Sequence, residues 1–160
     1  MRKVCSFCLA ECGPAGTEED AVSHGMCAAC YAHFVPQWEG LTLAEYLDRF
    51  EVPVVVVEGN WRFQAVNAAF VRLYGIDSRA GLGLLGGEAM ECVHARLPGG
   101  CGRTVHCQTC AIRRTVTRAL ATGEPQVGVP ATLARDAGEV ALRLSAEPRG
   151  ALVVLRIEPA

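Results

Sequence analysis

Nine cysteines are the residues of this 160-residue chain best suited to chemistry, and eight of them fall into two sets. The first set is two Cys-x-x-Cys pairs, Cys5 with Cys8 and Cys27 with Cys30, separated by 18 residues. Each pair can present two thiolates to one ion, and four thiolates complete a tetrahedral zinc site with no open position. The spacing therefore predicts a structural zinc site. Redox dithiols or unpaired thiols are the alternative.

The second set has uneven spacing and comprises Cys92, Cys101, Cys107 and Cys110. A helix is predicted over 107–122, which places Cys107 and Cys110 on one face at its start, where the helix dipole stabilises thiolates. Glycines beside Cys101 let the backbone turn tightly toward the same point. We expect a second metal site, filled by zinc or an iron-sulfur cluster, since four cysteines serve both. Buried structural thiols are the alternative.

Other polar residues near the cysteines have less specific roles. His24, His94 and His106 are possible alternate ligands, although a polar loop or surface role is the default for each of them. Arginines near the second set could offset the charge of four thiolates or could form a solvated helix face; they are Arg103, Arg113 and Arg114. No Cys-x-x-Cys pair is followed by histidine, so attached c-type haem is not expected.

Composition limits the partners and the compartment. A formal net charge of −2 gives no electrostatic footprint for nucleic acid, and no apolar run reaches the roughly 20 residues that cross a bilayer. The chain begins Met1-Arg2-Lys3-Val4-Cys5, without the apolar region of a secretory signal peptide. We therefore expect a cytoplasmic protein that binds neither membrane nor nucleic acid, whose thiols stay reduced.

Periodicity divides the chain into three parts. Residues 1–36 form a four-cysteine module, which a metal would have to stabilise. Residues 37–51 form a connector with a short amphipathic helix that begins at a capping box, Thr42 to Glu45. Residues 52–160 contain strands at 54–57 and 61–66, a helix at 68–74 between Asn67 and Gly75, the long helix at 107–122, and strands at 126–134, 139–146 and 151–157. This order predicts an α+β domain with an antiparallel sheet.

Three stretches carry a resemblance to a known family. The run from Pro53 to Phe70 resembles the paired first strands and first helix of a PAS domain. Ser23-His24-Gly25-Met26-Cys27-Ala28-Ala29-Cys30 is similar to a zinc-finger-like signature found beside PAS domains in bacterial signalling proteins. Residues of about 87–110 resemble the metal-site insertion of a cysteine-rich PAS variety. The resemblance implies a five-stranded antiparallel sheet with flanking helices after a small zinc knuckle, ligation by Cys92, Cys101, Cys107 and Cys110, and a possible homodimer.

The function that follows is sensory. We expect a PAS-type module of signal transduction that senses redox state, a metal or a small ligand through the second cysteine site. It would pass the signal to a separate protein, such as a histidine kinase or another regulator. The alternative is a zinc-stabilised adaptor with no sensing role. We do not expect an enzyme, since each Cys-x-x-Cys pair has partners suited to chelation and no hydrolase triad, kinase motif or phosphate loop is present.

Overall fold

The computed structural model describes residues 2–5, 8–11, 22–25, 27, 43–76 and 83–160. Two short strands near the N-terminus, β1 (Arg2–Cys5) and β2 (Val22–Gly25), pair in parallel. The helix α2 (Leu43–Asp48) leads from this part into the main domain. No helix within these ranges is long and apolar enough to cross a membrane.

The main domain is built on one antiparallel sheet of five strands in the order β4-β3-β7-β6-β5. The strands are β3 (Val54–Glu58), β4 (Phe63–Val66), β5 (Gln126–Arg135), β6 (Gly138–Arg149) and β7 (Leu152–Pro159). Short turns join β5 to β6 and β6 to β7, with Gly138 and Gly150 at positive φ. The predicted α+β class and five-stranded antiparallel sheet are confirmed.

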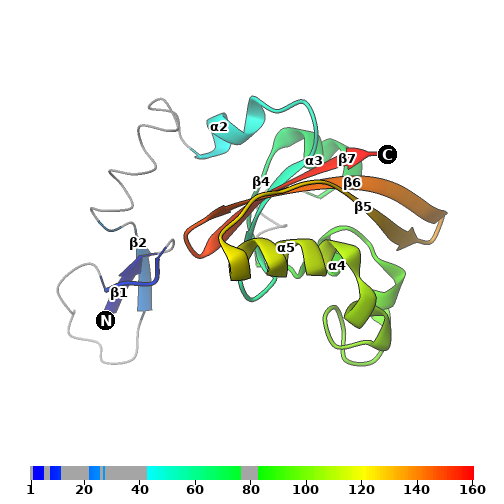
Figure 1. Cartoon of the computed structure of the whole chain (residues 1–160), viewed down its shortest axis with the longest axis horizontal. Coiled ribbons are helices and arrows are strands. Elements are labelled where there is room, and N and C mark those ends of the chain that lie inside the picture. The colour runs from blue at the N-terminus through cyan, green and yellow to red at the C-terminus, as the bar shows by residue number, and fades with distance from the viewer. Residues whose placement is uncertain (1, 6–7, 12–21, 26, 28–42, 77–82) are drawn as a thin grey trace.

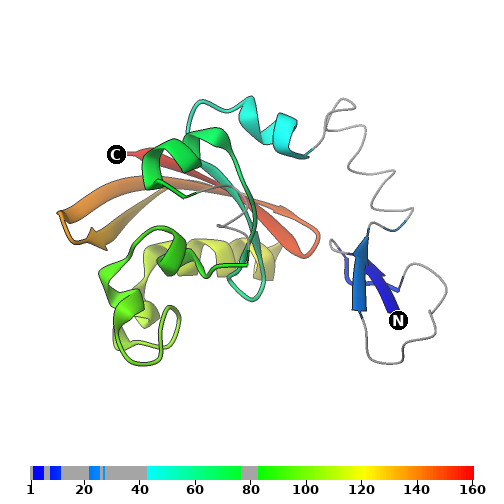
Figure 2. The ribbon, with the colours of Figure 1, turned by 180° about the vertical axis from the view of Figure 1, so that it is seen from behind.

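Helices cover the two faces of this sheet unequally. The helices α4 (Gly86–Ala89) and α5 (Ala111–Thr122) lie on one face and α2 lies on the other (Figures 1 and 2). Because successive strand residues point to opposite faces, Val55 and Val57 of β3 join the cluster beneath α5, whereas Val54 and Val56 join a second cluster with α2. The whole run Val54–Val57 is therefore buried.

The helix α3 (Ala68–Tyr74) has the two caps that the sequence predicts. The side chain of Asn67 accepts a hydrogen bond from the backbone N–H of Phe70 at 3.0 Å, and Gly75 ends the helix at φ 70°. Asn67 is buried, and its side-chain nitrogen also donates to the carbonyls of Leu47, Phe50 and Val52. One asparagine thus joins the connector to the first helix of the sheet domain.

The segment between α4 and α5 departs from the predicted secondary structure. The long helix begins at Ala111, not at Cys107. Cys107 lies instead in a 3₁₀ helix, η2 (Val105–Thr109), and Cys110 is the N-cap residue of α5. A second 3₁₀ helix, η1 (Val93–Arg96), follows Cys92. The sequence pattern does not separate the 3₁₀ turn from the α-helix, because both place residues three apart on the same side.

Candidate metal centres

The first cysteine set is gathered by the pairing of β1 with β2. Cys5 ends β1 and is paired with Gly25, which brings the chain before Cys27 beside it. The sulfurs of Cys5, Cys8 and Cys27 all lie within 4.8 Å of one another. Cys30, the fourth predicted ligand, and the ninth cysteine, Cys12, lie outside the described residues. His24 lies in β2, where its backbone pairs with Val4.

The separation of these sulfurs matches a zinc site. Four thiolates at about 2.3 Å from a tetrahedral zinc ion stand roughly 3.8 Å from each other. The Sγ atoms of Cys8 and Cys27 are 3.6 Å apart, well beyond the length of a disulfide bond. The three described residues therefore fit a metal in both chemistry and spacing.

This first site is not isolated from the sheet domain. Cys5 is fully buried in the same cluster as Leu47 of α2 and as Val54, Val56 and Leu152 of the sheet. In both views the pair β1 and β2 lies beside the turn between β6 and β7 (Figures 1 and 2). A metal held by Cys5 would consequently stabilise the packing on this face of the sheet as well as the small module.

The second cysteine set lines one cavity. Cys92, Cys101, Cys107 and Cys110 all contribute to a cavity of about 520 Å³ between the cysteine segment, the start of α5 and the concave face of the sheet. The sheet side of this cavity is mostly apolar, with residues such as Leu133, Leu142 and Leu155. The structure thus brings together four cysteines that the sequence spreads over 19 positions.

Hydrogen-bond donors are directed at two of these sulfurs. The backbone N–H of Gly102 lies 3.0 Å from Cys107 Sγ, and the Thr104 hydroxyl oxygen lies 3.2 Å from the same atom. Burial raises the pKa of Cys107, but these hydrogen bonds and the nearby charge of Arg113 outweigh it, so the pKa is lowered overall. Cys107 is therefore the thiol whose surroundings favour its anion.

Cys101 has the opposite balance. Burial raises its pKa, and the hydrogen bond from Gly87 N–H at 3.3 Å offsets this only in part. Gly87 also packs directly against Cys101: a methyl group at this position would lie 2.8 Å from Cys101 Sγ and 3.2 Å from Ala95 Cβ. Only a glycine allows α4 to approach the sulfur this closely, because such a contact is shorter than packed side chains tolerate.

Positive charge lies against the site through one arginine. The guanidinium of Arg113 lies 4.5 Å from the centre of the Trp61 ring and packs tightly on Gly102. Arg113 lines the cavity, whereas Arg103 and Arg114 are exposed. Of the three arginines that the sequence offers as compensating charges, Arg113 is the one whose charge lowers the pKa of both Cys101 and Cys107.

The two histidines near this set contact each other. The rings of His94 and His106 are stacked, with centroids 3.9 Å apart and planes 12° apart, and both residues line the cavity. This contact joins η1 to η2 across the glycine-rich turn. Either imidazole is near enough to the cavity to be an alternate ligand, as the sequence suggests.

The four thiols form an open arrangement in this structure. Among the described residues, the group of three or more potential ligands that gathers within 4.8 Å is Cys5, Cys8 and Cys27, and the second set forms no such group. Thiolate donors still suit zinc or an iron-sulfur cluster. The donor chemistry therefore fits a metal, and ligation by all four would require their sulfurs to move closer together.

Comparison with known proteins identifies the architecture of the main domain. The PAS domain of nitrogen regulation protein NR(II) from Vibrio parahaemolyticus superposes with a TM-score of 0.54 at 12% identity, covering 75% of this chain and 100% of that domain. The chain has the PAS fold. A PAS domain of the RpfR quorum-sensing receptor from Cronobacter turicensis, in complex with C12:0, superposes with a TM-score of 0.51 at 12% identity, covering 69% and 94%.

Sequence comparison finds no match to this chain. No protein-family model matches the chain, and no curated protein sequence matches it. At identities of this size the PAS likeness establishes the fold, and the chemistry has to be argued from the site itself. Two features of that site could not be predicted from the sequence. They are the stacking of Arg113 on Trp61 and the close approach of Gly87 to Cys101.

Proposed function

We propose that this chain is the sensory module of a cytoplasmic bacterial signalling system. The observation that carries the proposal is that all four cysteines of the second set line one cavity on the concave face of a PAS sheet. The two solved PAS domains above belong to a nitrogen regulation protein and a quorum-sensing receptor, which agrees with a role in signal transduction. We infer that the module reports redox state or metal supply.

The proposed sensing group is a zinc ion or an iron-sulfur cluster held by Cys92, Cys101, Cys107 and Cys110. A cluster held by four thiolates would be lost or altered on oxidation, and a zinc ion would be released when its thiolates are oxidised. The protein's own contribution is to favour the anion of Cys107, whose pKa is lowered by the contacts with Gly102 and Thr104 and by the charge of Arg113.

The helix α5 connects the second cysteine site to the sheet and could carry a structural change between them. Cys110 caps this helix, while Val116 and Ala119 on its buried face are part of the core cluster with β5, β6 and β7. A change in the position of Cys110 would therefore shift the start of a helix that is packed on three strands. We propose that a separate partner, such as a histidine kinase or another regulator, reads this change, and that a homodimer is the assembled form.

Metal analysis together with an ultraviolet-visible spectrum of protein purified without oxygen tests this function. We expect one zinc per chain together with iron, sulfide and a brown, air-sensitive absorbance. Cys101→Ser should remove the iron and its absorbance and keep the zinc, while Cys8→Ser should do the reverse. Absence of metal from the second set in the wild-type protein would refute the metal-sensing proposal.

The alternative is an adaptor in which zinc only stabilises the fold. The spacing of Cys5, Cys8 and Cys27 favours this view for the first site, because a closed four-thiolate zinc site has no position for a reactant. Two zinc ions per chain, no visible absorbance and no release of zinc on oxidation would support the adaptor. In that case the buried cluster around Cys5 and Leu47 would be the main consequence of metal binding.

A further inference from the structure

The cysteine segment from Glu91 to Cys110 has almost no apolar attachment to the core. Ala89 and Met90 are buried just before it, and Val116 is buried in the helix after it. Within the segment itself Thr104 is the one buried residue. The segment is therefore fixed at its two ends, and the hydrophobic effect contributes little to holding its middle against the sheet.

The backbone hydrogen bonds of this segment are local. Cys92 donates to Gly87, Ala95 to Cys92, Gly100 to Leu97 and Cys107 to Thr104. They shape successive turns and do not join the segment to a strand. Because such local bonds persist when a segment moves as a body, something else must hold the segment in the position that the structure records.

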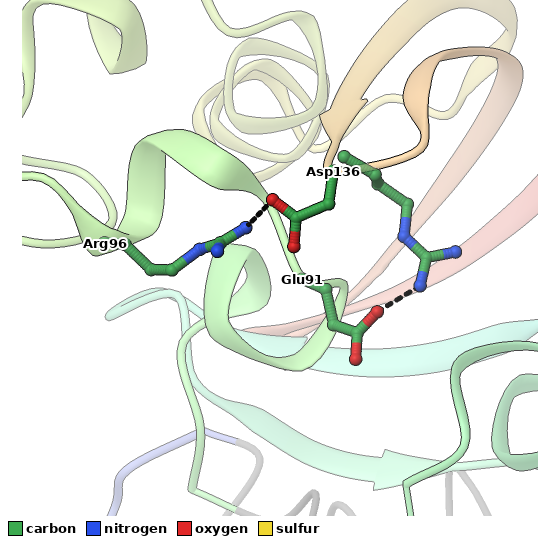
Figure 3. Close-up of polar contacts among 4 residues, drawn as sticks. Glu91, Arg96 and Asp136 are labelled. Carbon is green, nitrogen blue, oxygen red and sulfur yellow. Dashed lines mark hydrogen bonds and ion pairs between the residues drawn. The ribbon is translucent and has the colours of Figure 1, made fainter.

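Two ion pairs join the segment to the end of β5 and the turn that follows it. The guanidinium of Arg96 lies 2.7 Å from a carboxylate oxygen of Asp136, and Arg135 bonds to the carboxylate of Glu91 (Figure 3). In the sequence, Arg96 is 40 positions from Asp136 and Glu91 is 44 positions from Arg135. Both ion pairs lie where β5 turns into β6. The guanidinium of Arg135 also lies 5.4 Å from the Tyr74 ring, which ties this contact to the core.

The positions of these pairs relate them to the cavity. Cys92, His94 and Ala95 form one wall of the cavity. Glu91 directly precedes these residues in the chain and Arg96 directly follows them. Arg135 and Asp136 directly follow Ala134, which belongs to the opposite wall on β5. The pairs therefore join the two walls immediately outside the lining residues.

We propose that the pairs Glu91–Arg135 and Arg96–Asp136 are a latch that holds the cysteine segment over the cavity and limits access to its four thiols. The glycines that end the segment's turns, Gly99, Gly100 and Gly102, all have positive φ and give the segment room to change its fold when the latch opens. This inference rests on the proposed function only where opening of the latch is taken as part of sensing. The latch itself needs no metal.

The latch should be weak enough to open reversibly. The side chains of Arg96 and Asp136 are 59% and 79% exposed, and pairs of this kind contribute little to stability and are screened by salt. Breaking one pair should raise the open fraction about two- to fivefold and leave the domain folded. Reversing the charge of a partner should have the larger effect, because repulsion replaces attraction.

Alkylation of the metal-free, reduced full chain provides the test. The rates at Cys92, Cys101, Cys107 and Cys110 are followed by peptide mass spectrometry in the wild type, in Arg96→Asp, and in the charge exchange Arg96→Asp with Asp136→Arg. We expect alkylation about three- to tenfold faster in the single variant and restored to near the wild-type rate in the exchange. Salt at about 0.5 M should accelerate the wild type more than the single variant, which keeps only one of the two pairs.

Two further variants make the test specific. Glu91→Gln removes the charge of the second pair and should also accelerate alkylation. Glu147→Arg breaks an exposed pair with Arg149 on β6, away from the cysteine segment, and should leave the thiol rates unchanged. The latch is wrong if Arg96→Asp leaves the thiol rates at the wild-type value, or if the charge exchange reacts as fast as the single variant.

A metal-release measurement separates this inference from the proposed function. If the second set holds a metal, Arg96→Asp should lose it to a chelator several-fold faster than the wild type, and the charge exchange should restore the rate. If no metal binds there, the metal-sensing proposal fails. The alkylation rates then decide the latch by themselves.

Discussion

Replacing Asn67 should destabilise the domain far more than replacing any exposed asparagine. Its side-chain oxygen accepts from the backbone N–H groups of Val54 and Phe70, at 2.9 and 3.0 Å. Its nitrogen donates to three carbonyls, of which Val52 at 2.9 Å is the closest. Asn67 thus fixes the start of β3, the start of α3 and the end of the connector at the same point.

The expected loss for Asn67→Ala follows from these contacts. The N-cap contributes about 1 kcal/mol. The buried N–H of Val54 would lose its acceptor, which costs about 1–3 kcal/mol, and the carbonyls would lose their shared donor, which adds roughly 1 kcal/mol. We therefore expect the free energy of unfolding to fall by about 3–5 kcal/mol, a large part of the 5–15 kcal/mol typical of a domain.

Urea denaturation followed by circular dichroism measures this loss, with two variants beside it. Asn67→Asp keeps a good N-cap but replaces the donor by an oxygen that faces three carbonyls, so it should still lose at least about 2 kcal/mol. Asn60→Ala removes an exposed acceptor for the Arg62 N–H and should cost less than about 1 kcal/mol. If Asn67→Asp is as stable as the wild type, the donor contacts contribute nothing and the reasoning is refuted.

Three other expectations concern the cysteine sites. Gly87→Ala would normally favour a helix, but the contact with Cys101 Sγ should reverse the sign and cost about 1–3 kcal/mol in a urea titration; equal or greater stability would contradict the packing argument. In metal-free protein, the lowered pKa of Cys107 and the raised pKa of Cys101 should make Cys107 alkylate first between about pH 6 and 8, with Cys101 gaining at higher pH. Equal rates across that range would oppose the assignment. If Cys5, Cys8 and Cys27 hold a metal, its chelation should increase hydrogen exchange in α2 and β7, measured by mass spectrometry, whereas unchanged protection would show that the first site does not stabilise the sheet.

Local sequence signals predicted the sheet and its first helix well. The caps of α3 are adjacent to the helix in the chain, so Asn67 and Gly75 could be recognised without any tertiary information. The strands alternate or run as apolar blocks, and the structure extends β6 to Arg149 where the sequence predicts an end at about 146. Strand ends are set by pairing with β7, which the pattern of β6 alone does not contain.

The site depended more on long-range contacts. Cysteine spacing predicted two metal sites. In the structure, three described cysteines of the first set lie in one group, and all four cysteines of the second set line one cavity. The parallel pairing of β1 with β2 joins two four-residue strands, which are too short to show a periodic pattern in the sequence. The ion pairs Glu91–Arg135 and Arg96–Asp136 join distant residues of common types, so no local pattern indicates them.

The burial of four successive valines in β3 has an evolutionary consequence. A strand with one solvent-exposed face can accept polar substitutions at every second position. Val54 to Val57 has no exposed position, because all four side chains are buried. Val54, Val56 and Leu152 are covered by the cluster that includes Cys5 and Leu47. Loss of the small cysteine module would therefore uncover part of this face of the sheet. A descendant that discarded the module would be expected to acquire polar residues at these three positions.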